Sequence, residues 1–99
     1  MARVALLCPD LLFGSRVEGA LRAAGHEVTS ADPDVFVVDL TENGNSDTRP
    51  PGEVPAIGFY PHVDVETRKR ALAAGYDVVV PRSKMARETV AVVERALGQ

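Results

Sequence analysis

The sequence predicts an α/β fold built on a parallel sheet, because apolar runs of strand length alternate with helical patterns along the chain. The clearest run is Val35–Asp39, in which four β-branched or aromatic residues precede one carboxylate. A strand that is apolar on both faces is typical of the buried centre of a parallel sheet. In such sheets ligands bind outside the carboxyl ends of the strands, so Asp39 is the first candidate for function. The same residue is equally well placed to cap the loop that begins at Thr41.

Five short segments have the composition of strands, and breaks rich in Gly, Pro, Asp or Asn separate them. These strands are predicted at residues 3–8, 27–29, 35–38, 54–59 and 78–80. The segment 41–53 contains Pro50, Pro51 and Gly52, which favour a loop.

Two helices carry clear start and stop signals. The first is predicted over residues 11–24, with Asp10 as its N-cap and Gly25 as its stop. Its apolar stripe consists of Phe13, Val17, Ala20, Leu21 and Ala24. The second is predicted over residues 65–74, capped by Asp64 and ended by Gly75. His26 follows the first helix and is expected to be an exposed turn residue.

The last helix is predicted to begin at Ser83 or Lys84. Its apolar positions repeat at helical spacing, and they are Ala86, Val90, Val93 and Leu97.

The length and composition are those of one globular domain, residues 1–99, with 45% hydrophobic and 25% charged residues. A formal charge of −3 gives no electrostatic reason to bind nucleic acid. No apolar stretch approaches the ~20 residues that span a membrane. The single cysteine, Cys8, can form neither an internal disulfide nor a cysteine metal cluster, which agrees with a cytoplasmic location.

Four segments together resemble the receiver domain of bacterial two-component response regulators. They are residues 11–13 (LLF), 23–26 (AAGH), 38–40 (VDL) and 70–77 (RALAAGYD), and the last is the most specific. The resemblance implies a compact, doubly wound, flavodoxin-like fold with five parallel strands. It also implies that Asp39 corresponds to the aspartate that accepts the phosphoryl group in receivers.

The acidic pair that holds a divalent cation in receivers does not match. Cys8 and Pro9 stand at those positions, and only Asp10, one residue late, remains. Magnesium is usually held by one or two carboxylates together with phosphate oxygens, so Asp10 and Asp39 are at most weak metal candidates. No cofactor is therefore expected, and Mg²⁺ enters only if Asp39 is phosphorylated.

Other positions of the receiver pocket also differ. Tyr60 replaces a Thr or Ser, Val79 replaces the switch aromatic, and Arg82 replaces the receiver lysine. Arg82 is predicted to pair with Asp39 through a bidentate contact that neutralises the site permanently. Tyr60 either directs its hydroxyl at Asp39 or lies on the surface. His62 either faces Asp39 or lies in solvent.

The resemblance also shows what has been lost. Receivers have helices after the second and third strands, whereas here only six residues, 30–35, separate Thr29 from Phe36, and the segment 41–53 is a loop. Both helices are expected to be shortened or missing. Because the strands remain apolar on both faces, the sequence predicts a homodimer that covers the open face, with the loop at its edge.

The sequence thus favours a stand-alone, degenerate receiver-like module that acts by protein–protein interaction without phosphorylation, rather than an enzyme. Arg68, Lys69 and Val79 belong to the region that is the partner surface in receivers. The first alternative is a genuine receiver that is phosphorylated on Asp39.

The second alternative is a phosphocysteine-type enzyme that uses Cys8. Such enzymes hold phosphate with consecutive backbone N–H groups, small residues and an Arg six positions after the Cys. Here Pro9 lacks an N–H group, residues 11–13 are bulky, and Gly14 stands at the arginine position. These departures weigh against the enzyme.

Overall fold

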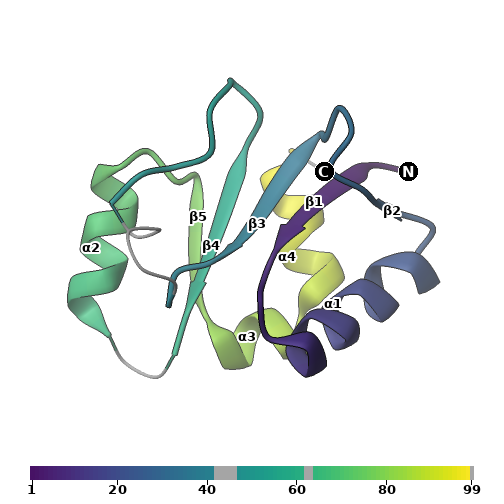
Figure 1. Cartoon of the computed structure of the whole chain (residues 1–99), viewed down its shortest axis with the longest axis horizontal. Helices are drawn as coiled ribbons and strands as arrows, with labels where there is room; N and C mark the ends of the chain where they lie inside the picture. The colour runs from purple at the N-terminus through teal and green to yellow at the C-terminus, as the bar shows by residue number, and fades with distance from the viewer. Residues whose placement is uncertain (42–46, 62–63, 99) are drawn as a thin grey trace.

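The computed structural model describes residues 1–41, 47–61 and 64–98, and its centre is a parallel five-stranded sheet (Figure 1). The strand order is β2-β1-β3-β4-β5, which is the doubly wound order expected from the resemblance. The strands are β1 (Arg3–Leu7), β2 (Glu27–Val28), β3 (Val35–Asp39), β4 (Ala56–Tyr60) and β5 (Val78–Pro81).

Helices cover the two faces of the sheet unequally (Figure 1). One face carries α1 (Leu11–Ala23) together with α3 (Arg82–Arg87) and α4 (Thr89–Ala96), whereas the other carries α2 (Val65–Ala73). The predicted caps are confirmed, because the Asp10 carboxylate accepts the Leu12 and Phe13 N–H groups and the Asp64 carboxylate accepts the Thr67 N–H. Within the described ranges, no helix is long and apolar enough to cross a membrane.

The core is divided by the sheet into two clusters. The larger cluster lies under α1, α3 and α4, and its bulkiest members are Leu21, Ile57, Phe59 and Met85. The smaller cluster lies on the α2 side and consists of Val38, Leu40, Ala56, Tyr60, Ala71 and Tyr76. The side chains of β3 enter both clusters, as the apolar pattern of this strand predicts.

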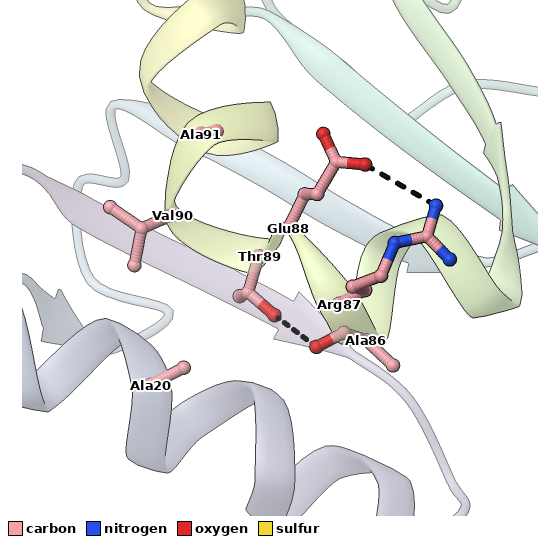
Figure 2. A pocket seen from close by; sticks show the side chains of 7 residues that line it. All are labelled: Ala20, Ala86, Arg87, Glu88, Thr89, Val90 and Ala91. Carbon is pink, nitrogen blue, oxygen red and sulfur yellow. Dashed lines mark hydrogen bonds and ion pairs between the residues drawn. The ribbon is translucent and has the colours of Figure 1, made fainter.

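The last helix differs from the prediction because it is broken at Glu88, which has φ −125° and ψ 37°. The Thr89 hydroxyl donates to the carbonyl of Met85 at 2.6 Å, so a side chain supplies a bond at the junction. A groove of about 360 Å³ lies beside this break, between α1 and the α3–α4 junction (Figure 2). The buried residues of this region are Met85, Thr89, Val92 and Val93, so of the four predicted positions only Val93 is buried.

No helix lies between β2 and β3, and none lies in the described parts of the β3–β4 connection, residues 40–41 and 47–55. The loop that leads into β4 instead passes along the α2 side of the sheet (Figure 1). Its residues 48–51 line a groove together with residues of β1 and β3. A folded loop therefore stands in part of the space where the missing helices would lie.

Arg49 fixes this loop to the rest of the domain. Its guanidinium donates to the carbonyls of Pro50, Gly75 and Val54 and pairs with Asp77 at 3.4 Å. Gly75 has φ +103°, and a Cβ at this position would lie 3.2 Å from Arg49 Cδ, so glycine suits both the turn and the contact. We call these contacts of Arg49 the clamp, and they join the loop to the turn between α2 and β5.

The surface of the chain is no larger than that of an ordinary monomer. Its accessible area is 5518 Å², close to the about 5,500 Å² expected for a folded chain of this mass. The absence of a helix from the β2–β3 connection and from the described part of the β3–β4 connection has therefore not left an unusually extended surface.

His26 is buried, with 6% of its surface exposed, so the expectation of an exposed turn residue was wrong. Its Nδ1 accepts the Ala2 N–H at 3.1 Å, and its Nε2 lies 3.3 Å from the Glu94 carboxylate. Because Nδ1 accepts, Nε2 carries the proton and donates to Glu94. The imidazole therefore connects the start of β1 to α4.

Ala24 was predicted to belong to the apolar stripe of the first helix, but it is exposed.

Candidate functional site

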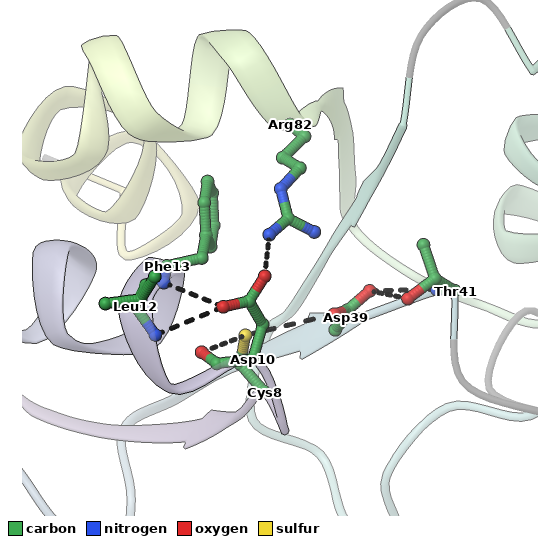
Figure 3. Close-up of polar contacts among 7 residues, drawn as sticks. All are labelled: Cys8, Asp10, Leu12, Phe13, Asp39, Thr41 and Arg82. Carbon is green, nitrogen blue, oxygen red and sulfur yellow. Dashed lines mark hydrogen bonds and ion pairs between the residues drawn. The ribbon is translucent and has the colours of Figure 1, made fainter.

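Four of the residues singled out in the sequence meet at the carboxyl end of the sheet (Figure 3). Cys8 and Asp10 follow β1, Asp39 ends β3, and Arg82 begins α3. Parallel pairing of β1 with β3 sets Leu7 opposite Val38, which brings the two strand ends to the same edge. This edge is where an α/β fold binds ligands.

The Asp39 carboxylate is buried and already engaged. Only 2% of the residue is exposed. Its Oδ1 accepts hydrogen bonds from the Thr41 N–H at 2.9 Å and from the Thr41 hydroxyl at 2.6 Å, and its Oδ2 lies 3.9 Å from Cys8 Sγ. Asp39 thus caps the loop that begins at Thr41, which is one of the two roles expected from its position.

Arg82 forms its ion pair with Asp10, and the predicted pairing with Asp39 was wrong (Figure 3). Arg82 pairs with Asp10 because the N-terminus of α1, which Asp10 caps, lies beside the start of α3. The cap carboxylate lies within reach of Arg82, while the ring of Phe13 lies 4.1 Å below the guanidinium. The aromatic face and the carboxylate together hold the cation at α1.

The pKa of Asp10 is lowered below its ordinary range. The main cause is the hydrogen bond from the Phe13 backbone N–H, followed by the hydrogen bond from Arg82. One oxygen of this carboxylate accepts the helix N–H groups and the other binds Arg82. A metal ion at this carboxylate would have to compete with the Arg82 cation for Oδ2.

The two weak metal candidates, Asp10 and Asp39, therefore have different partners. Within the described residues, no three carboxylate, histidine or cysteine side chains gather closely enough to share a metal ion. A phosphoryl group on Asp39 would also need a cation, and Arg82, which the resemblance places at the position of the receiver lysine, is bound to Asp10.

Cys8 is poorly suited to nucleophilic chemistry. Burial is the main effect on its thiol and raises the pKa above the ordinary value. The hydrogen bond with the Asp10 carbonyl lowers this pKa, the charge of Asp39 raises it, and the charge of Arg82 lowers it, with a net rise. Its Sγ lies 3.6 Å from the Asp10 carbonyl oxygen. A phosphocysteine enzyme requires a thiolate in a cradle of N–H groups, which is the reverse of this environment.

The remaining predicted positions lie elsewhere. Tyr60 is 7% exposed and packs in the smaller core cluster, so of the two alternatives for this residue the surface position was wrong. Val79 is half-buried against the same cluster. Arg68 and Lys69 are exposed on α2. His62 lies outside the described residues.

Two residues of the site were missed in the sequence. Thr41 provides two donors to the Asp39 carboxylate, and an Asp followed two positions later by Thr is a pattern that could have indicated this turn. Phe13 supports Arg82, but 69 positions separate the two residues and no local pattern links them.

No protein-family model matches the sequence, and no curated protein matches it. Solved structures do match over the whole chain. A response regulator from Chloroflexus aurantiacus is 18% identical, with a TM-score of 0.82 over 99% of this chain and 98% of its own. A receiver protein from Burkholderia phymatum is 22% identical, with a TM-score of 0.82 over 99% of this chain and 96% of its own.

A CheY-like receiver domain from Methanospirillum hungatei is 13% identical, with a TM-score of 0.75 over 99% of this chain and 94% of its own. Identities at this level establish the fold, and they do so across nearly the full length of each chain. The chain therefore has the flavodoxin-like fold of response regulator receiver domains.

Proposed function

We propose that this chain is a signalling module that acts by binding other proteins and is not switched by phosphorylation. The observation that carries the proposal is the state of Asp39. Its carboxylate is buried, one oxygen accepts two hydrogen bonds from Thr41, and the nearby cation Arg82 is bound to Asp10.

Phosphoryl transfer to a carboxylate needs an oxygen that can reach the donor and positive charge that neutralises the product. At Asp39 the first requirement is opposed by burial and the second by the Asp10–Arg82 pair. The absence of the acidic pair at Cys8 and Pro9 acts in the same direction, because metal binding there lacks its usual ligands.

The test is intact mass after incubation with a small phosphodonor and magnesium. We expect no gain of a phosphoryl group, whereas a phosphorylatable receiver treated in parallel gains one. A gain that disappears in Asp39→Asn would overturn the proposal and establish a phospho-accepting receiver. A gain that disappears in Cys8→Ser would establish the phosphocysteine alternative instead.

The proposed partner surface lies on α2. Val65, Arg68, Lys69 and Leu72 follow a spacing of three, four and seven residues, so they share one side of the helix. Val65 is 53% exposed and Leu72 is 42% exposed. Cations between two exposed apolar residues fit a partner segment that is acidic and apolar.

This surface is tested by the double charge reversal of Arg68→Glu with Lys69→Glu. We expect a partner captured by the wild-type chain to be lost by this variant and retained by Arg95→Glu, in which an exposed cation of α4 is changed instead. Equal loss with both variants would show a general charge effect and would argue against the α2 surface.

We also propose that the protein is not an enzyme, that it acts in the cytoplasm, and that it binds neither nucleic acid nor a membrane. The elevated pKa of the Cys8 thiol supports the proposal that the protein is not an enzyme. The net charge of −3 supports the proposal that it does not bind nucleic acid.

The predicted homodimer stays part of the proposal. The open part of the sheet between β1 and the clamped loop is the surface that it would bury.

A further inference from the structure

An apolar groove runs along the open part of the sheet. It has a volume of about 400 Å³, and its apolar lining consists of Leu7, Phe36, Val38, Pro50, Pro51 and Tyr76. The floor comes from β1 and β3, and the far wall is the loop that Arg49 clamps. Leu7, on the near side, is 44% exposed although it belongs to an inner strand of the sheet. The groove is therefore an apolar surface with a rigid wall.

The same end of the sheet presents an apolar projection. Leu11 and Leu12, in the first turn of α1, are 82% and 87% exposed, and among the described residues only Met1 is a more exposed large apolar residue. Asp10 caps this turn, so both leucines are held on a fixed backbone. Two adjacent exposed leucines on a rigid turn are costly in water unless a partner covers them.

The projection and the groove carry opposite charges at their margins. Arg16 lies one turn after Leu12 on α1 and is exposed. Asp47 and Glu53 lie at the two ends of the loop segment that walls the groove, and both are exposed. None of these three side chains forms an ion pair with another residue of the described ranges. A second copy would bring the cation of one chain toward the anions of the other.

We propose that two copies of this chain associate by reciprocal insertion, with Leu11 and Leu12 of each copy seated in the groove of the other. This inference rests on the self-association proposed above and specifies its contacts. Only Cys8, Pro9 and Asp10 separate Leu7 from Leu11, so the projection and the edge of the groove are at most about 14 Å apart along the chain. A two-fold axis between them makes both contacts at once, as a closed isologous interface requires.

The inference is tested by sedimentation velocity or light scattering on wild type and two variants. Leu12→Asp places a charge in the projection, and an acidic residue in the first turn of a helix suits the helix dipole, so α1 is kept. Leu7→Lys blocks the groove. We expect a dimer for wild type at micromolar concentration and monomers for each variant, with folding checked by circular dichroism. Pro51→Lys replaces Leu7→Lys if the latter does not fold.

The decisive experiment is to mix the two variants. Leu12→Asp keeps an intact groove and Leu7→Lys keeps an intact projection, so the mixture is expected to form a heterodimer that neither variant forms alone. The matched control is Val65→Asp, which introduces the same charge at an exposed apolar residue on α2, and it is expected to remain dimeric.

A monomeric wild type would overturn both the inference and the self-association on which it rests. A dimeric wild type that is unaffected by Leu12→Asp would overturn only the inserted leucines and leave self-association standing. Failure of the two folded variants to associate on mixing would also refute reciprocal insertion. The phosphorylation test uses neither variant, so its outcome is independent of these results.

Discussion

Replacement of Arg49 by alanine is predicted to destabilise the domain more than any other change at an arginine in the described residues. The guanidinium donates to three carbonyl oxygens and pairs with Asp77, and the arginine side chain is only 22% exposed. Hydrogen bonds to charged groups contribute about 1.5–3 kcal/mol each, although such contributions are not additive within one side chain. We therefore expect the free energy of unfolding to fall by about 2–4 kcal/mol.

That loss is a large share of the total stability, which is on the order of 5–15 kcal/mol for a chain of this length. Urea unfolding at fixed protein concentration measures it directly. With a slope near 1 kcal/mol per molar urea, the midpoint falls by about 2 M or more. Arg49→Lys keeps the charge but loses the planar fork of donors, so its midpoint is expected between those of wild type and the alanine variant.

Arg68→Ala is the matched control, because Arg68 is exposed on α2 and forms no ion pair within the described ranges. We expect its unfolding free energy to lie within about 0.5 kcal/mol of wild type. If Arg49→Ala also stays within that margin, the loop is held by its apolar contacts and the clamp does not stabilise the fold.

Three further predictions concern the buried and capping polar groups. His26→Ala removes a buried imidazole with two partners and is expected to lower the unfolding free energy by about 2 kcal/mol. Glu94→Gln retains a hydrogen-bond acceptor for the imidazole and should lower it much less. Equal losses of stability in urea unfolding would contradict the role of His26 in joining Ala2 to Glu94. The pKa of Asp10 is lowered in the folded chain, so its charge stabilises the fold above the ordinary pKa near 4 and this contribution is lost as the pH falls below it. The urea midpoint of Asp10→Asn should therefore fall less between pH 5 and pH 3 than that of wild type. If the two midpoints fall equally over this range, other carboxylates cause the acid destabilisation. Asp39→Asn should keep the fold, as circular dichroism would show. Because it removes one of the effects that raise the pKa of the Cys8 thiol, it should also speed alkylation of Cys8 at neutral pH, and slower alkylation would contradict that assignment.

The local signals of the sequence predicted the sheet and two helix starts well. The apolar run of β3, the caps at Asp10 and Asp64 and the glycine stops at Gly25 and Gly75 all act within a few residues, so a single sequence shows them. The absence of a helix between β2 and β3 followed equally well from the shortness of that connection.

Two of the misplaced features depend on contacts between distant parts of the chain. Arg82 had two carboxylates within reach of the same sheet edge, and the position of Phe13 at α1 decided between them. His26 follows a helix stop, which is typical of a turn, but α4 and the start of β1 bury it. The break at Glu88 is a third, local difference. It is followed by the β-branched residues Thr89 and Val90, but their lowered helix propensity is too weak a signal to locate a break.

The clamp at Arg49 has a consequence for recognising other chains built in this way. Three of its four acceptors are main-chain oxygens, which every residue type provides, so the loop and the turn that it joins are free to change their side chains. Only the arginine, the glycine at Gly75 and the carboxylate at Asp77 leave a trace in the sequence. Receiver folds shortened in the same manner should therefore share an arginine in the β3–β4 loop and a Gly-x-Asp turn before β5, with little other similarity between them.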